Sequence, residues 1–491
     1  MADFTTIGAP FGPAVPMTPL QRTALAFLFL LALVSTFGGV LVQELHHTAV
    51  FYAAMSRQMV ETGDPLAPFR GESAYLLKPP LALWWGALNG LVFGFDNFAM
   101  TLPSRLGGLG CAVMTWLLAR RLFGGFTAPW VATLVFVTNS LYVHFTTAFR
   151  LDSLMTFGAL LVLWGYLHLD RPRGAAALSS GLALSVFTKG PMILAMLLPL
   201  LPHALLAGSW RRISPALWRW LWLLVLPGAW FAWVWMFKGG ELAAQLNDDF
   251  WRGSSSNPAL SAFEAAWLEY AVKPARRLWP WLPLLLLALA WGIARCCSRH
   301  PSRTERLDLG LLLLLFVLNF GIAWVKPDPD FRYLYAGLPL VAVLCGGLVA
   351  RWLGSDLPRW TVVLAGVGLL AVVPPVVQYN LENMPELRDR RAMQRMASAG
   401  ELTIRNTAML VGSIPPPDAP RRNDPVPDWV YFYLGLEPPR VRMADVAKLP
   451  AAVDFVLVSR NRALEQKLEA KGFEPRLRAV KVALYQRVAQ R

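Results

Sequence analysis

Side chains that could exchange a proton with a substrate lie near the start of the chain. Glu44 is followed by His46 and His47, and Asp152 opens a later apolar stretch. A carboxylate or a neutral imidazole can accept a proton from a reacting group at neutral pH. We therefore treat Glu44, His47 and Asp152 as candidate catalytic residues, although capping of a helix N-terminus would also explain Asp152.

A second set of candidates is cationic or polar and could bind a phosphate. Two prolines after Lys78 can open a helix, which would fix this ammonium at the helix start, and Lys189 lies in a tight Thr-Lys-Gly-Pro turn. Ordinary interfacial charge is the alternative for each of them, but several such residues at one membrane face indicate a functional site. The predicted phosphate-binding residues are Arg57, Lys78, Lys189, Lys326, Arg332 and Tyr333.

The composition indicates an integral membrane protein. Of the 491 residues 55% are hydrophobic and only 16% are charged, and the mean hydropathy is +0.43. The net charge of +15 is spread over short clusters between apolar runs, so it does not predict nucleic-acid binding. The four cysteines lie in or beside apolar segments, with the spacing of neither a disulfide framework nor a metal site.

Apolar runs predict about eleven transmembrane helices, with an upper limit of thirteen. Clusters of arginine recur in every second connecting loop, which places those loops and the N-terminus in the cytoplasm and the chain after residue 380 outside. The predicted crossings are 23–42, 104–119, 127–147, 152–169, 175–189, 190–207, 219–237, 279–294, 307–325, 333–351 and 360–379.

Two apolar segments fit this alternation only as helices that lie on the outer membrane surface. They cover 49–61 and 81–95, and they make 43–103 one large external loop. A second external loop is predicted over 238–278.

The last part of the chain has the pattern of a small α/β domain. We predict a buried strand over 453–460, an amphipathic helix over 462–473 that is closed by Gly472, and an alternating strand over 478–488. The predicted organisation is thus a cytoplasmic segment 1–22, a transmembrane domain 23–380 and a periplasmic α/β domain 381–491.

The order and spacing of many short motifs resemble the aminoarabinose-transferase and protein-mannosyltransferase superfamily, whose members are membrane glycosyltransferases of the GT-C type. The resemblance covers about 23–350, and no single motif is decisive. The matching residues are Phe51-Tyr52, Arg57, Met59, Thr62-Gly63-Asp64, Lys78-Pro79-Pro80-Leu81, Trp85, Arg105-Leu106, Arg120-Arg121-Leu122-Phe123-Gly124, Leu151-Asp152, Thr188-Lys189-Gly190-Pro191 and Arg332-Tyr333.

The resemblance implies transfer of a sugar from a polyprenyl-phosphate donor to a lipid, glycan or protein acceptor at the periplasmic face of a bacterial inner membrane. Lys78 and Arg332 match positions that would stabilise the leaving phosphate, and Asp152 matches an acid that organises the pocket. Leu77 stands where relatives often have an acid, so we assign no metal ligands and leave a divalent cation open. The expected partners are the donor, the acceptor and membrane lipids, and we expect a monomer.

One departure from the superfamily concerns the general base. Its usual acidic pair corresponds here to Thr48 and Ala49. Glu44 one turn earlier, His46 or His47, or an acceptor that is already ionised could replace it. A flippase or transporter, and a non-catalytic protein that binds lipid-linked sugars, remain as alternative functions.

Overall fold

The structure is a computed structural model of the whole chain. It describes residues 17–40, 44–45, 48–70, 73–190, 193, 197–209, 213, 218, 220–247, 275–298, 301–325, 332–354, 361–411, 425–436, 440–442, 453–459, 462–479 and 482–487.

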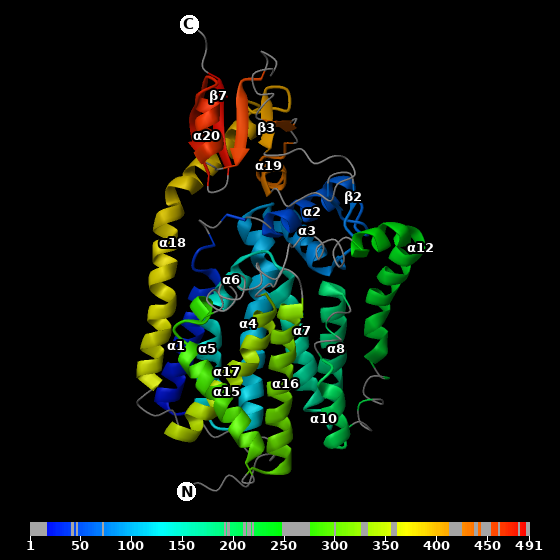
Figure 1. Ribbon diagram of the computed structural model, residues 1–491, viewed down its shortest axis with the longest axis vertical. Coiled ribbons are helices and arrows are strands. Elements are labelled where there is room, and N and C mark those ends of the chain that lie inside the picture. The colour runs from blue at the N-terminus through cyan, green and yellow to red at the C-terminus, as the bar shows by residue number, and fades with distance from the viewer. Residues whose placement is uncertain are drawn as a thin grey trace, which may run out of the picture.

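A long helical bundle carries a small β-sheet at one end (Figure 1). The helices are α1 (Pro19–Phe37), α2 (Thr48–Thr62), α3 (Leu81–Phe93), α4 (Asn97–Phe123), α5 (Thr127–Val137), α6 (Ser140–Thr147), α7 (Leu151–Tyr166), α8 (Pro172–Lys189), α10 (Leu200–Leu206), the 3-10 helix η1 (Leu221–Leu224), α12 (Val225–Asn247), α15 (Leu282–Cys297), α16 (Arg303–Val325), α17 (Arg332–Leu353), α18 (Thr361–Ser398), α19 (Pro425–Leu434) and α20 (Arg462–Glu469). The strands are β1 (Phe69–Arg70), β2 (Ser73–Ala74), β3 (Thr407–Val411), β4 (Arg440–Arg442), β5 (Phe455–Ser459), β6 (Phe473–Arg478) and β7 (Val482–Arg487).

The bundle is a multi-pass helical membrane fold, as its sequence predicts. Within the described residues, four helices are long and apolar enough to cross a bilayer, and a fifth span results if the bent pair α6 and α7 counts as one. Every predicted crossing overlaps a helix, but several of these helices are shorter than a bilayer requires. The number of eleven crossings therefore stays a prediction.

The predicted crossing 127–147 differs from the structure, which breaks it into α5 and α6. Thr138 caps the end of α5, and the side chain of Asn139 accepts a hydrogen bond from the backbone N–H of Leu141 at 2.9 Å. This Asn cap starts a new helix in another direction. At the far end of α6 the chain turns again, by 113° into α7.

The first predicted loop, 43–103, contains both predicted surface helices, as α2 and α3, but it ends earlier than predicted because α4 begins at Asn97. Both surface helices lie across the end of the bundle nearest the C-terminal sheet (Figure 1). The second predicted loop, 238–278, differs at its start. Helix α12 continues to Asn247 across a kink at Lys238, and 248–274 lie outside the described residues.

Helices α7 and α8 form an antiparallel hairpin with unusually close backbones. A Cβ atom on Gly165 would overlap the backbone nitrogen of Leu178 and the carbonyl oxygen of Gly174. Only a residue without a side chain allows this approach. Because the hairpin is antiparallel, the first turn of α7 lies beside the last turn of α8. The basic turn at Arg171 consequently lies at the opposite end of the molecule from Asp152.

The C-terminal sheet has the strand order β4-β3-β5-β7-β6. Strands β4 and β5 pair with β3 in parallel, whereas β7 pairs antiparallel with β5 and β6. The predicted strand 453–460 and the helix that ends before Gly472 are present. The alternation predicted for 478–488 is wrong, because four successive residues of β7 are buried. The sequence analysis missed β3, β4, β6 and α19.

Helix α18 joins the bundle directly to this C-terminal region. Its 38 residues run along the bundle and continue to the sheet without a break (Figure 1). The predicted boundary at residue 380 therefore falls inside a helix, and the division into two domains remains a prediction.

Candidate active site

The site is built around an ion pair between Asp152 and Lys189. The Nζ atom of Lys189 donates a hydrogen bond to Oδ1 of Asp152 at 2.6 Å. The side chain of Lys189 is only 5% exposed and that of Asp152 only 8%. The structure thus joins two predicted site residues that are 37 positions apart in sequence.

The ends of the α7–α8 hairpin determine this geometry. Asp152 lies in the first turn of α7 and Lys189 is the last residue of α8. A carboxylate at a helix N-terminus and an ammonium at a helix C-terminus are both favoured by the helix dipoles. Gly190 ends α8 with φ of +87°, a conformation that glycine adopts without strain.

The start of α7 is also fixed to α4. The Ser104 hydroxyl accepts a hydrogen bond from the backbone N–H of Arg150 at 2.9 Å and donates one to its carbonyl oxygen at 2.8 Å. Ser153 donates to the carbonyl oxygen of Phe145 at 2.9 Å. Asp152 is therefore held by backbone contacts on both sides.

A buried ion pair contributes little to stability, because the cost of removing two charges from water offsets most of their attraction. In a chain with so few charges, such a pair at the end of membrane helices is a functional-site candidate. Helix α3 contacts α8, the helix that ends with Lys189.

Lys78 belongs to the same end of the hairpin. A methyl group on Gly190 would lie 3.9 Å from Cδ of Pro79, so the segment that follows Lys78 is adjacent to the turn that follows Lys189. The indole ring of Trp84 packs edge-on against Phe187 with a centroid distance of 5.2 Å. These contacts place Lys78 and Lys189 on neighbouring segments.

The segment before Lys78 is fixed by α12. Gln245 accepts a hydrogen bond from the backbone N–H of Leu76 at 2.9 Å and donates one to the carbonyl oxygen of Ala74 at 2.6 Å. Trp230, also on α12, donates to the carbonyl oxygen of Leu66 at 3.0 Å. The helical start of the predicted second loop thus shapes the first loop.

Glu44, a predicted base, is 1% exposed and lies beside a cation from the far part of the chain. Its Oε1 atom is 3.9 Å from Nη1 of Arg390 on α18, and Arg390 is itself buried. The guanidinium of Arg390 also lies over the ring of Tyr433 at 5.0 Å. Arg390 and Tyr433 were missed by the sequence analysis, since Arg390 is one of several arginines in a charged stretch.

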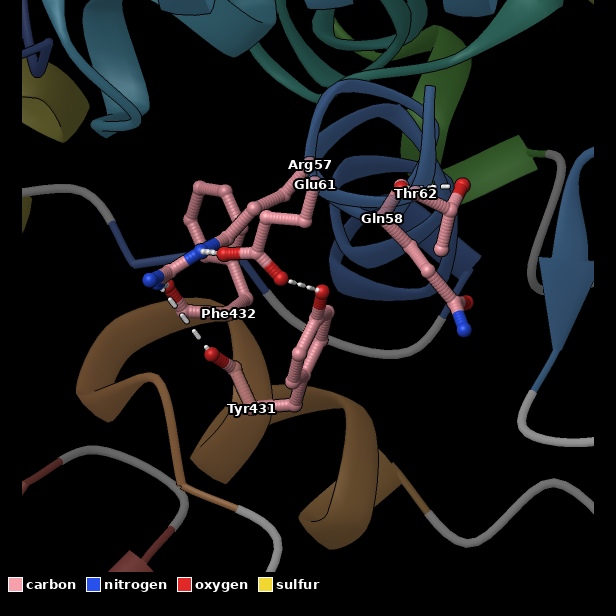
Figure 2. A network of polar contacts seen from close by, with 6 residues as sticks. All are labelled: Arg57, Gln58, Glu61, Thr62, Tyr431 and Phe432. Atoms are coloured by element: carbon pink, nitrogen blue, oxygen red, sulfur yellow. Dashed lines mark hydrogen bonds and ion pairs between the residues drawn. The ribbon is translucent and has the colours of Figure 1, made fainter. Parts of the chain in front are cut away.

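Arg57, a predicted phosphate-binding residue on α2, is bonded to the C-terminal part of the chain. Its side chain bonds to Glu61 and to two carbonyl oxygens at the end of α19 (Figure 2). The part of the chain that the structure describes thus gives Arg57 a role in holding α19.

The structure describes the remaining predicted residues only in part or not at all. His46, His47 and Lys326 are outside the described residues. Arg332 and Tyr333 form the first turn of α17, and the structure describes only their backbone. Among the described residues, no three His, Cys, Asp or Glu side chains gather into a group that could hold a metal ion.

The helical bundle, with α2 and α3 across the end nearest the C-terminal sheet, shares its fold with two solved structures. Two crystal structures of ArnT from Cupriavidus metallidurans, one bound to undecaprenyl phosphate and one in the apo state, match this chain with TM-scores of 0.64 and 0.65. Each match covers 96% of this chain and 99% of the other at 17% identity.

Sequence comparisons confirm the predicted resemblance. Residues 77–236 match the family of dolichyl-phosphate-mannose-protein mannosyltransferases. An undecaprenyl phosphate-alpha-4-amino-4-deoxy-L-arabinose arabinosyl transferase of Pseudomonas fluorescens is 26% identical over 340 residues, or 66% of this chain and 58% of the relative. Its counterpart in Edwardsiella ictaluri is 28% identical over 347 residues, or 68% and 60%. The chain is thus similar to the aminoarabinose transferases, and the matches span about three fifths of these relatives' length.

Proposed function

We propose that the protein transfers a sugar from a polyprenyl-phosphate donor to a lipid, glycan or protein acceptor at the periplasmic face of a bacterial inner membrane. The observation that carries this proposal is the buried pair of Asp152 and Lys189, held next to Lys78 at one end of a GT-C fold. The names of the curated relatives, which are undecaprenyl-phosphate-dependent arabinosyl transferases, support the donor class.

The reaction exchanges one bond at the anomeric carbon of the sugar. The acceptor oxygen forms a bond to this carbon while the bond to the phosphate oxygen breaks, and the polyprenyl phosphate leaves with its additional negative charge. Fixed cations stabilise that charge most strongly where water is excluded. Lys189 and Lys78 are the described side chains that we assign to this role, and Arg332 is assigned by its motif alone.

Asp152 orients Lys189 in this scheme. An ammonium group has three donors, so Lys189 can keep its bond to Asp152 and direct another N–H toward a phosphate oxygen. The acceptor's proton goes to Glu44 or to His46 or His47, or is already absent when the acceptor is an anion. A carboxylate or imidazole in this place accepts the proton as a general base.

The transporter alternative requires ionisable groups along a path through the bilayer. Arg105 on α4 is one described candidate, and it is fully buried. Its guanidinium donates to the Thr101 hydroxyl and to the backbone carbonyl oxygen of Thr36. These bonds tie the end of α1 to α4, which is a structural role, so this group favours the enzyme.

Comparison of lipid-linked and envelope glycans by mass spectrometry tests the proposal. Cells with the gene should contain a glycosylated product that cells without it lack, and variants Lys78→Ala, Asp152→Ala and Lys189→Ala should fail to restore it. Full restoration by all three variants would refute the site. Movement of labelled lipid across vesicles without sugar transfer would instead identify a flippase, and donor binding without turnover a non-catalytic protein.

A further inference from the structure

Helix α19 contacts the first external loop at two points, and the first is Arg57. Its Nη1 atom donates to the carbonyl oxygens of Phe432 at 2.8 Å and Tyr431 at 3.3 Å (Figure 2). The last carbonyl oxygens of a helix lack partners within it, and a cation there is favoured by the dipole. Glu61 bonds Arg57 at 2.8 Å and accepts the hydroxyl hydrogen of Tyr431. The first contact therefore joins the second half of α2 to α19.

The second contact is Tyr433, the penultimate residue of α19. Its hydroxyl accepts a hydrogen bond from the backbone N–H of Leu45 at 2.8 Å and donates one to Oδ1 of Asn97. Gln394 on α18 donates to the backbone oxygen of Tyr433 at 3.4 Å. Tyr433 thus holds the residue that directly follows Glu44.

Apolar packing joins the two contacts. Trp429, Val430 and Phe432 of α19 are buried in one cluster with residues of α2, α3 and the first turn of α7, among them Leu151. The core of the C-terminal region is therefore continuous with the packing around the first turn of α7, where Asp152 lies. A shift of α19 would therefore disturb the packing of α2, α3 and the first turn of α7.

We propose that α19 is a two-point clamp and that Tyr433 and Arg390 are positioning residues for Glu44. Tyr433 fixes the backbone at Leu45, and Arg390 supplies the positive charge beside the Glu44 carboxylate. Arg57 fixes α2 to the end of α19. The catalytic part of this inference rests on the proposed function. The clamp itself does not.

The chemical reason is that a general base must lie within hydrogen-bond distance of the proton that it removes. Displacement of a reacting group by about 1 Å can reduce the rate by about 100-fold. A buried carboxylate also needs a nearby cation or hydrogen bonds to stay ionised. Two contacts that position the segment around Glu44 come from α18 and α19.

Substitution Tyr433→Phe tests the clamp, because it removes both hydroxyl bonds and keeps the ring beneath Arg390. We expect faster amide hydrogen exchange in residues 44–62 of the purified full-length protein. We also expect kcat to fall by about 10- to 100-fold with little change in the KM of the donor. Arg57→Gln should accelerate exchange mainly in the second half of α2, and Arg57→Lys should restore part of the protection.

Gln58→Ala is the matched control, since Figure 2 shows the Gln58 amide on α2 directed away from Arg57 and Glu61. It should leave exchange and kcat unchanged. Unaltered exchange in Tyr433→Phe would overturn the clamp, and faster exchange with full kcat would overturn the positioning role. If the wild-type protein transfers no sugar, the proposed function and the positioning role fail together, while the exchange data still decide on the clamp.

Discussion

Asp152 and Lys189 are paired because two helix ends meet, and their chemistry follows from that pairing. The sequence analysis placed these residues in one candidate site, since each sits at a helix end beside a recognisable turn, and their ion pair brings them together. It could not show that Arg57 bonds to α19, because the two partners are 374 and 375 residues apart. Contacts over such distances have no signature in local sequence.

Separate substitution of either partner should impair both stability and transfer. Lys189→Met leaves a buried carboxylate without its ammonium, which in buried pairs costs about 3–5 kcal/mol. The double variant Asp152→Asn with Lys189→Met should recover much of that stability, because neither charge remains. Thermal unfolding in detergent measures this difference. Equal melting temperatures for the single and double variants would contradict a tight pair.

Glu44 and the two histidines make different predictions for transfer. If Glu44 is the base, Glu44→Gln should reduce kcat by about 100- to 10,000-fold while the His46→Ala and His47→Ala variants stay active. The reverse result would assign the base to a histidine, with loss of activity at acidic pH as the imidazole becomes protonated. Full activity in all three variants would leave an ionised acceptor as the explanation. Initial rates over a range of pH provide the comparison.

At the scale of elements, the close contact of α7 and α8 determines whether the site can form. Hydropathy predicted both helices. The distance between them depends on where glycines lie, and a hydropathy pattern does not reveal those positions. The same limit explains the break at Thr138 and Asn139, since a capping side chain interrupted an otherwise continuous apolar run. Helix α19 was missed for a similar reason, because the segments around it have no strand or helix pattern.

The substitution Gly165→Ala should push helices α7 and α8 apart. Its new methyl group would overlap the backbone of α8 at Leu178 and Gly174, so we expect a loss of about 1–3 kcal/mol in unfolding free energy. Transfer should fall as well, because the ends of α7 and α8 would move apart. Gly310→Ala on α16 is the control, since nothing lies within 4 Å of the added atom. Similar melting temperatures for the two variants would argue against close packing.

At the scale of the whole molecule, the basic turn at Arg171 and the candidate site lie at opposite ends of the α7–α8 hairpin. Which end faces the cytoplasm remains a prediction. A natural cysteine can test it, because Cys297 is exposed at the end of α15 while Cys111 and Cys345 are buried.

A membrane-impermeant maleimide should label Cys297 only after the cells are opened. The double variant Cys296→Ser with Cys297→Ser should abolish that labelling, since the neighbouring Cys296 is partly exposed. The exposed Lys471 offers a control of opposite sense, since Lys471→Cys in this double-variant background should react in spheroplasts that have kept an intact inner membrane. Labelling of Cys297 in such intact spheroplasts would invert the topology and move the site to the cytoplasmic face.

Turnover of a polyprenyl-phosphate sugar by the purified protein in liposomes tests the central claim most directly. The quantity to follow is release of polyprenyl phosphate per protein molecule, with lipid and glycan acceptors supplied. The wild type and Gln58→Ala should release it at equal rates, and the folded double variant Asp152→Asn with Lys189→Met should be at least about 100-fold slower. Equal turnover by the double variant would show that the reaction does not use this ion pair.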